Sequence, residues 1–497
     1  MMQQIWRWVH SKKITPWAVY SGLALLVLLP LLLPGYVVTL DLVFTPHFSW
    51  PSELTNTYLF DALLWLVLFI VPGDIIEKII LFFILLLSGV GMYRLLEPLR
   101  PKDLSAELWR FAPYFAGVFY MINPFTYSRF MAGQWLVLAG YALLPFFFAA
   151  LLKLAASPTW RSSVNVSLWG FAIVTLSIHH AGMLLLLGVL VVGTNIRRAK
   201  NKSLLFRLLG FMSVSVLIVA LLSSYWLIPA LLGKGEIGRA VSDFTTVDFL
   251  AFATTAHGPL GALGEVIRLQ GFWTEVRGLY LLPQAVVPLW GVLFVLIWTM
   301  VVIGGVKLWR YSHSWALLTY LIIGLGVILA ATPFIAWLSQ FLPALSGYRE
   351  PHKFINLTVL GYAMLGGIGS AYVIRWALRR YGEAGSQISA VICLFLPLVI
   401  TPVMLWGFAG QLSPRHYPQE WYEVNGTLKR INGRGAVLVL PWHQYMKYEF
   451  SGRIIANPAE KFFEVPVIAS NDPEFKQVSP TVPDAKKQAI TKALRER

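Results

Sequence analysis

A single acid placed just after an apolar stretch is the first residue in this chain that could do chemistry. Asp41 follows the first long apolar stretch almost at once. A carboxylate at the depth of a membrane interface is partly desolvated, which moves its pKa towards the range of a general base. We therefore take Asp41 as the candidate catalytic base, with an ordinary helix-end acid in contact with water as the alternative. His47, in the same loop, is a weaker candidate for contacting a substrate.

The densest group of charges lies in the segment SGYREPHKF, directly before a late apolar stretch. It contains Arg349, Glu350, His352 and Lys353, and Pro351 fixes the turn between them. Three groups that can carry positive charge predict an anionic partner, and a lipid-linked phosphate or diphosphate suits this depth. Glu350 is the acidic candidate for substrate binding. The alternative is an ion-paired loop in which Glu350 only neutralises Arg349.

Two further segments carry candidate binding residues. In INPFTYSRFMAGQW, Pro124 and Gly133 favour a structured hairpin that would turn Arg129 outward towards a lipid phosphate. A snorkelling interface arginine is an equal alternative. In GFWTEVRG, Trp273 beside Glu275 could stack on a sugar ring and bind its hydroxyls, although tryptophan is also common at membrane interfaces.

No metal site is predicted. The only cysteine, Cys393, excludes a disulfide within the chain and a cysteine-based metal cluster. The adjacent His179 and His180 would point in different directions on a helix, which disfavours a joint metal site. The sequence requires no cofactor, although it leaves a divalent cation open.

The composition defines the elements that must hold these residues. The chain has 497 residues, of which 57% are hydrophobic and 13% charged, and its mean hydropathy is +0.65. Soluble domains are about 45–50% apolar and about 25% charged, so this is a membrane protein. Its long runs are apolar on every side rather than alternating, which predicts an all-α polytopic protein and not a β-barrel.

We expect about eleven transmembrane helices. The expected spans lie near 17–38, 75–93, 109–122, 135–153, 163–178, 181–195, 204–231, 284–304, 315–333, 354–374 and 387–409. The apolar stretch 59–72 is too short to cross and suits an interfacial helix.

Positive charge predicts the sidedness of these spans. With eleven crossings, most Lys and Arg fall on the side of the basic N-terminal segment 1–16, which the positive-inside rule makes cytoplasmic. The net charge of +16 then needs no nucleic acid as a partner. The cytoplasmic connections are short, so we expect a multi-pass plasma-membrane protein whose function faces the extracytoplasmic side.

The expected domain organisation follows from the longer outer segments. A membrane domain covers 17–410, with outer loops at 39–74 and 233–282. After it, residues 411–497 contain a strand-like run, Ala436–Leu440, and polar alternation. This pattern predicts a small extracytoplasmic α/β segment.

The order of these parts resembles the GT-C superfamily of membrane glycosyltransferases. The stretches LDLVFTPHFSWP, LLLSGVGMYRLL, INPFTYSRFMAGQW and GYREPHKF are similar to the α-(1→3)-arabinofuranosyltransferase-type membrane core and to YfhO-like membrane proteins. The resemblance covers roughly residues 17–410.

The resemblance implies a glycosyltransferase that uses a polyprenyl-phosphate sugar outside the cytoplasm, most simply by an inverting reaction. Its acceptor would be an extracytoplasmic glycan, lipid or protein. Carried over to this chain, Asp41 becomes the general base that deprotonates the acceptor. Arg349 and Lys353, with His352, become ligands of the donor phosphate.

Two other classes stay open on the sequence alone. A transporter or flippase of lipid-linked substrates should show internal repeats and ionisable residues in broken mid-membrane helices. Here the ionisable residues gather at the outer helix ends instead. A non-catalytic protein that binds lipid carriers is the third possibility.

Overall fold

The computed structural model describes residues 15–51, 53–196, 202–431, 435–472 and 484–495. Most of the expected N-terminal segment 1–16, and the middle of the connection after 196, lie outside these residues. Within them, six helices are long and apolar enough to cross a membrane: Gly73–Leu99, Trp135–Ala156, Ser203–Leu222, Trp290–Tyr311, His313–Ala331 and Pro351–Ile400. The chain is therefore a helical membrane protein, as its composition predicts, while the count of eleven spans stays a prediction.

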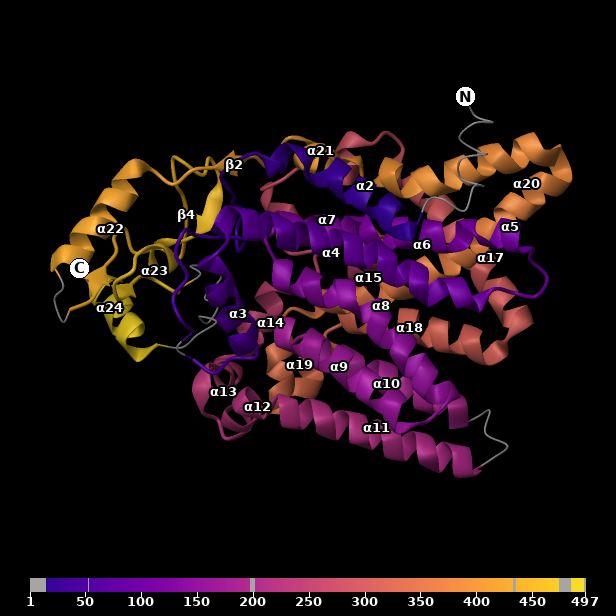
Figure 1. Cartoon of the computed structure of the whole chain (residues 1–497), viewed down its shortest axis with the longest axis horizontal. Coiled ribbons are helices and arrows are strands. Elements are labelled where there is room, and N and C mark those ends of the chain that lie inside the picture. The colour runs from indigo at the N-terminus through magenta and orange to yellow at the C-terminus, as the bar shows by residue number, and fades with distance from the viewer. Residues whose placement is uncertain (1–14, 52, 197–201, 432–434, 473–483, 496–497) are drawn as a thin grey trace.

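The first part of the chain forms a bundle of long helices that run along the longest axis of the molecule (Figure 1). Its elements are α2 (Pro16–Leu28), the 3-10 turn η1 (Leu29–Leu32), α3 (Tyr58–Leu68), α4 (Gly73–Leu96), α5 (Ala106–Trp109), α6 (Phe111–Met121), α7 (Pro124–Met131), α8 (Trp135–Ala156), α9 (Trp160–Leu176), α10 (His180–Ile196), α11 (Lys202–Leu222) and α12 (Ser224–Leu231). The first helix ends earlier than the expected span 17–38 because Pro30 lacks an amide donor and the helix gives way to η1.

The expected outer loop 233–282 is folded into short helices. These are α13 (Gly235–Asp243), α14 (Thr246–Ala251), α15 (Gly261–Ile267) and η3 (Glu275–Arg277), followed by α16 (Pro283–Val286). Trp298 Nε1 and the hydroxyl of Tyr362 both donate to the carbonyl of Ile267, at 3.1 Å and 3.3 Å. The loop therefore packs against the long helices instead of extending away from them.

The last long helices bring the charged segment SGYREPHKF into the body. They are α17 (Trp290–Tyr311), α18 (His313–Ala331), α19 (Phe334–Ser339), the 3-10 turns η4 (Pro343–Tyr348) and η5 (Pro351–Phe354), and α20 (Ile355–Ile400). The helix α20 is bent at Gly382, whose φ of 68° lies in the left-handed region. The expected spans 354–374 and 387–409 are thus joined by a bend, and the second ends at Ile400, before η6 (Pro402–Met404) and α21 (Leu405–Ala409).

Glycines let α17 and α20 touch backbone to backbone. A Cβ atom on Gly304 would lie 1.8 Å from the carbonyl oxygen of Leu365, and one on Gly369 would lie 1.8 Å from that of Met300. Small residues at such points are typical of helix contacts in membranes. The sequence GGIGS, which includes Gly369, therefore serves helix packing and is not a nucleotide-binding loop.

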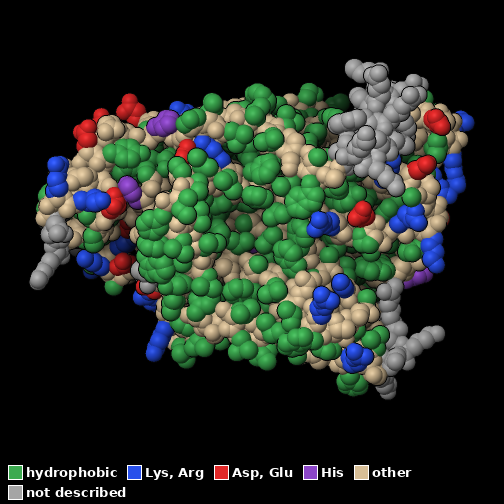
Figure 2. Space-filling view, in the orientation of Figure 1, with side chains coloured by type: hydrophobic (Ala, Val, Ile, Leu, Met, Phe, Trp, Pro, Cys, Tyr) green, Lys and Arg blue, Asp and Glu red, His purple; other side chains and the backbone are tan. Residues whose placement is uncertain are grey.

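On the face drawn in Figure 2, hydrophobic side chains cover much of the helical body, and most of the charged side chains lie towards its two ends. Leu217 and Leu221 on α11 and Val302 on α17 are among the exposed large hydrophobic side chains. An exposed apolar band with charged ends is the surface that a membrane-spanning bundle presents to lipid.

The C-terminal segment lies at one end of the bundle, at the left of Figure 1. It contains β2 (Pro414–Arg415), α22 (Gln419–Ile431), β3 (Val437–Leu438), β4 (Tyr445–Lys447), β5 (Ile454–Ala456), α23 (Ala459–Phe462), β6 (Val467–Ile468) and α24 (Ala485–Arg495). Antiparallel β4 and β5 place Tyr445 opposite Ala456, parallel β3 and β6 pair Val437 with Val467, and β2 pairs Arg415 with Tyr36 of β1 (Tyr36–Val37). The mixed α/β character agrees with the sequence, and β3 falls inside the expected run Ala436–Leu440.

Candidate active site

Asp41 lies in a tight turn that packs against the hairpin around α7. Its backbone N–H donates to the carbonyl of Ala132 at 3.2 Å. Gly133 approaches the same turn so closely that a Cβ on it would lie 2.2 Å from the Leu42 nitrogen and 2.4 Å from the Thr39 oxygen, and its φ is +72°. Asn123 caps α7 by accepting from Thr126 N at 3.0 Å. The hairpin expected from Pro124 and Gly133 is therefore present and fixes the backbone of Asp41.

The C-terminal segment holds the other side of this turn. Leu40 N donates to Ile454 O at 3.3 Å, and Ala456 N donates to Leu40 O at 2.8 Å. From the neighbouring strand, the hydroxyl of Tyr445 donates to Oδ1 of Asp41 at 2.6 Å. Oδ2 of Asp41 has no hydrogen-bond partner among the described residues.

Asp41 opens onto a cavity of about 430 Å³ that the bundle, the folded loop and the C-terminal segment form together. Trp273, Arg349, Glu350 and Lys353 line the same cavity. Its other lining residues are Leu40, Ala132, Gln134, His179, Phe244, Phe252, Arg277, Leu279, Gly347, Gln444, Tyr445 and Ile454. The structure thus brings the acid of the first loop and the cationic segment, more than three hundred residues apart in sequence, to one site.

The carboxylate of Asp41 is exposed to this cavity and enclosed by protein elsewhere. Burial raises the pKa of Asp41, and Glu350 adds to the shift. The hydrogen bond from Tyr445 and the charges of Lys353 and Lys461 act against it. A carboxylate whose pKa is raised in this way is a stronger base than one in water.

Arg129 lies beneath the cavity and not at the lipid surface, which corrects the expectation that it faces outward. Its side chain is fully buried and forms an ion pair with Oε1 of Glu350. It also donates to Gln134 Oε1 at 2.5 Å and lies over the ring of Phe272, 4.0 Å from its centroid. A buried guanidinium must be paired, and Glu350 supplies that charge from a distant part of the chain.

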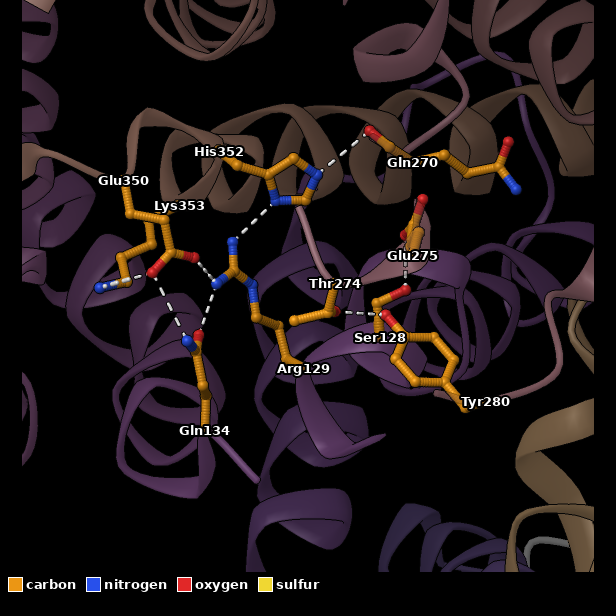
Figure 3. Close-up of polar contacts among 10 residues, drawn as sticks. All are labelled: Ser128, Arg129, Gln134, Gln270, Thr274, Glu275, Tyr280, Glu350, His352 and Lys353. Atoms are coloured by element: carbon orange, nitrogen blue, oxygen red, sulfur yellow. Dashed lines mark hydrogen bonds and ion pairs between the residues drawn. The ribbon is translucent and has the colours of Figure 1, made fainter. Parts of the chain in front are cut away.

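His352 is also buried and has both ring nitrogens occupied (Figure 3). Nε2 lies 3.1 Å from the carbonyl oxygen of Gln270, and Nδ1 lies 2.7 Å from Nη2 of Arg129. Since a carbonyl only accepts and a guanidinium only donates, the ring is neutral with its proton on Nε2. Neither Arg129 nor His352 lines the cavity, so both act on it through their neighbours.

Glu350 joins the buried cations to the cavity. Its Oε2 lies 3.2 Å from Nζ of Lys353 and 3.4 Å from Nε2 of Gln134. Burial alone would raise the pKa of Glu350, but Arg129 and Lys353 outweigh it and hold the pKa below its usual value. Among the described residues, Glu350 therefore forms its ion pairs with Arg129 and Lys353, whereas the ion-paired-loop alternative expects a pair with Arg349.

Arg349 forms its ion pair with Asp248, which lies in the folded loop 233–282. Nη1 of Arg349 lies 3.2 Å from Oδ1 of Asp248, and its guanidinium stacks on the rings of Phe244 and Phe252, 4.1 Å and 4.8 Å from their centroids. Asp248 is anchored in turn because its Oδ2 accepts from the N–H of Thr245 at 2.8 Å. The loop 233–282 therefore positions one of the cations of the cavity.

The two candidates of the segment GFWTEVRG face different ways. Trp273 lines the cavity and has the guanidinium of Arg277 over its ring, 4.8 Å from the centroid. Glu275 is absent from the cavity lining; it accepts from Ser128 Oγ at 2.7 Å (Figure 3) and from Gly271 N at 2.9 Å. Burial raises the pKa of Glu275 to about 7, against the lowering effect of these hydrogen bonds.

His47 stands apart from the cavity. Its Nε2 lies 3.4 Å from Oε1 of Glu464, and it is absent from the cavity lining. Among the described residues no group of three or more His, Cys, Asp or Glu side chains is arranged to hold a metal ion.

Sequence reasoning missed Tyr445, Asp248 and Gln134. No local motif marks them, because each is defined by its partner: Asp41, Arg349 and Arg129 respectively. The only available signal was the aromatic and polar alternation around Tyr445 in the C-terminal segment.

These features define a helical membrane protein with a cavity at one end of its bundle that charged and aromatic side chains line together. No protein-family model matches the chain, and no curated protein matches it. Among solved structures, arabinofuranosyltransferase AftD from mycobacteria has a similar fold. A mutant form of AftD aligns at a TM-score of 0.56 and 14% identity, over 94% of this chain and 33% of that one. Another AftD structure aligns at a TM-score of 0.55 and 15% identity, over 92% and 31%.

The comparison establishes the architecture. The chain shares the fold of the part of AftD that it matches. It spans about a third of the length of the AftD chains that it matches. At this identity the similarity concerns the fold, and the activity has to be argued from the cavity.

Proposed function

We propose that this protein is a GT-C-type glycosyltransferase that moves a sugar from a polyprenyl-phosphate donor to a glycan, lipid or protein acceptor. The observation that carries the proposal is the joint lining of one 430 Å³ cavity by Asp41, Arg349 and Lys353. An inverting displacement needs a base at the acceptor and positive charge at the departing phosphate. The GT-C-like fold supports the same reaction class.

In the proposed reaction Asp41 is the general base. Its Oδ2 accepts the proton of the acceptor hydroxyl while the acceptor oxygen forms a bond to the anomeric carbon of the donor. The bond between that carbon and the phosphate oxygen breaks, and the electron pair leaves with the polyprenyl phosphate. Tyr445, which donates to Oδ1 at 2.6 Å, holds the carboxylate in one orientation during this step.

We assign the leaving phosphate to Lys353 and Arg349. The ammonium of Lys353 has three N–H donors, and its ion pair with Glu350 leaves donors that can meet an anion. Arg349 offers a planar guanidinium that can bind phosphate bidentately. Arg129 and His352 serve as positioning residues, because they hold Glu350 and the η5 turn from below.

Trp273 is the proposed platform for a sugar. It lines the cavity beside Arg277, and an indole face can pack against the apolar face of a sugar ring. Glu350 and Gln134 line the same wall and can accept or donate hydrogen bonds to hydroxyls. His47 and Glu275, both named from the sequence as substrate contacts, have no such place in this proposal, because neither lines the cavity.

We further propose eleven spans, with the cavity on the extracytoplasmic side of the plasma membrane. The end of the bundle away from the C-terminal segment contains the bend of α20 and the connection that holds α5 (Figure 1). Both segments are rich in basic residues. The positive-inside rule makes that end cytoplasmic. A labelling experiment with membrane-impermeant thiol reagents on single-cysteine variants at Asp103 and Glu423 tests this orientation.

The activity test uses the purified full chain, a radiolabelled polyprenyl-phosphate sugar and a crude envelope acceptor. Asp41→Asn should reduce transfer by about 10³-fold or more while donor binding is kept, since one proton acceptor is lost. Lys353→Gln should weaken donor binding. Unchanged transfer by Asp41→Asn removes the base assignment. Donor binding with no transfer by the parent chain would favour a non-catalytic carrier-binding protein, and donor movement across vesicles without transfer would favour a flippase.

A further inference from the structure

A second cavity, of about 570 Å³, lies between α17 and α20 at the other end of the bundle. It is lined by Lys307, Tyr372, Arg375, Trp376 and Arg379, together with Asp103, Ile303 and Val373. The α5 helix, which follows Asp103, and the bend of α20 mark this end in Figure 1, opposite the strands that carry Tyr445. The second cavity therefore has no part in the proposed sugar transfer.

The glycine contact between the two helices explains why a cavity opens here. The backbones of α17 and α20 meet at Gly304 and Gly369. One turn further along, at Lys307 and Tyr372, side chains replace glycines and hold the helices apart. Tyr372, Arg375, Trp376 and Arg379 are spaced three, one and three residues apart, which puts them on one face of α20, towards α17.

The cavity carries more positive charge than the protein neutralises. Arg375 is paired, since its Nη1 lies 2.7 Å from Oδ2 of Asp103, and Tyr372 donates to Oδ1 of the same acid at 2.8 Å. Lys307 lies over the ring of Tyr372, 5.0 Å from its centroid. Within the described parts of the chain, neither Lys307 nor Arg379 has a carboxylate partner. One acid thus faces three cations.

The surroundings of the cavity are apolar and face outward. On α17, Val302 and Val306 are 62% and 46% exposed, and on α20 the indole of Trp376 is 59% exposed. Exposed apolar side chains along a membrane helix lie against acyl chains, and tryptophan favours the level of the headgroups. A ligand of this cavity therefore needs a negative head and apolar chains.

We propose that this cavity is a binding site for the phosphate of an anionic phospholipid. Lys307 and Arg379 contact the phosphate oxygens, and Trp376 packs along the glycerol and the first acyl carbons. Basic pockets between transmembrane helices are a known kind of site for anionic headgroups. A recessed cavity flanked by lipid-facing helices favours a lipid over an acidic protein, whose surface could not enter between α17 and α20. This inference is independent of the proposed sugar transfer.

Native mass spectrometry of the full chain in a neutral detergent tests the site. The protein is titrated with phosphatidylglycerol and, separately, with phosphatidylcholine, which has no net charge. We expect phosphatidylglycerol to bind at least about tenfold more tightly, and the double variant Lys307→Gln/Arg379→Gln to lose roughly tenfold or more of that affinity. Lys307→Arg/Arg379→Lys keeps both charges and should keep the affinity.

The matched control is Arg310→Gln/Arg380→Gln, which removes two positive charges from the same two helices outside the cavity lining. It should leave the affinity for phosphatidylglycerol within about twofold of the parent, because only the cavity charges make direct contact. An equal loss in this control overturns the site in favour of diffuse surface charge. Equal binding of both lipids, or full displacement of phosphatidylglycerol by inorganic phosphate, also overturns the assignment to a phospholipid.

Discussion

The hydroxyl of Tyr445 donates a hydrogen bond of 2.6 Å to Oδ1 of Asp41 across 404 positions of sequence. The contact joins the C-terminal segment to the first loop after α2 (Pro16–Leu28), at the wall of the 430 Å³ cavity. It makes the C-terminal segment part of the candidate active site. It also holds one carboxylate oxygen of Asp41 and lowers the pKa of the acid against the larger, raising effect of burial.

Tyr445→Phe should move the acid limb of the pH–rate profile to higher pH. The hydrogen bond from Tyr445 lowers the pKa of Asp41 against the raising effect of burial, so its removal leaves the pKa higher. The other charged groups that act on Asp41 are Glu350, Lys353 and Lys461, and the substitution leaves them in place. Transfer rates measured across about pH 4 to 9 check this shift.

This experiment tests the role of Asp41 as the base separately from the role of Tyr445 in tuning its pKa. If Asp41→Asn abolishes transfer and Tyr445→Phe leaves the acid limb in place, Asp41 remains the base and only the role of Tyr445 is lost. A rate that falls equally at every pH in Tyr445→Phe would likewise show that the tyrosine supports the fold without tuning the acid.

Gly133→Ala should displace the turn that carries Asp41. A Cβ at Gly133 would come within 2.2 Å of the Leu42 nitrogen at a φ of +72°, so strain and overlap should destabilise the protein by about 2–4 kcal/mol and reduce transfer. Gly193→Ala in α10 (His180–Ile196) is the control, since a Cβ there meets nothing within 4 Å. Thermal unfolding in detergent compares the two, and equal midpoints would contradict the prediction.

The buried pair of Arg129 and Glu350 should be more costly to break than to remove. Arg129→Leu leaves Glu350 beside only one cation and should cost about 3–5 kcal/mol, as expected when one partner of a buried ion pair is lost. Arg129→Leu/Glu350→Leu/Lys353→Leu removes all three charges, because Glu350 also pairs with Lys353 at 3.2 Å, and should recover part of that loss. Arg239→Leu, whose partner is Glu53 in an exposed pair 3.6 Å apart, is the control and should change stability by less than about 1 kcal/mol. A triple variant less stable than Arg129→Leu would contradict this account.

Glu275 should make the protein less stable as the pH rises towards neutrality. Burial raises its pKa to about 7 from an ordinary value of 4.5, so the folded state binds a proton that the unfolded state has already lost. Its contribution is fully present below pH 4.5 and disappears as the pH rises through 7. In Glu275→Gln the unfolding midpoint should fall less over this window, and an unchanged slope would show that Glu275 is ionised in the folded protein.

The sequence predicts the class of this protein well because lipid imposes its own rule on the chain. Every backbone group in the bilayer must be satisfied internally, so long apolar runs become helices. The expected spans correspond to α2, α4, α6, α8 to α12, α17, α18 and the two halves of α20. The errors fall at helix ends, as at Leu28 and Gly382, where proline or a left-handed glycine decides the boundary and hydropathy carries no signal.

The sequence predicts several residues of the candidate site but not the contacts between them. The sequence does identify four site residues: Asp41, Arg349, Glu350 and Lys353. Charged side chains next to apolar helices cost desolvation free energy, so they indicate a functional site. The sequence does not predict their ion pairs, since Glu350 pairs with the distant Arg129 and Arg349 pairs with Asp248. The expectation that Arg129 faces outward was wrong because its ion-pair partner, Glu350, is distant in sequence.

By itself, then, the sequence determined a helical membrane protein with an acid and a cationic segment near helix ends, because composition and periodicity act locally along the chain. Only the tertiary structure decided that these groups share a cavity, that Tyr445 holds Asp41, and that Arg129 is buried beneath them. Contacts of this kind depend on how helices and loops pack, because ion pairs form between groups that are close in space, whatever their separation in sequence.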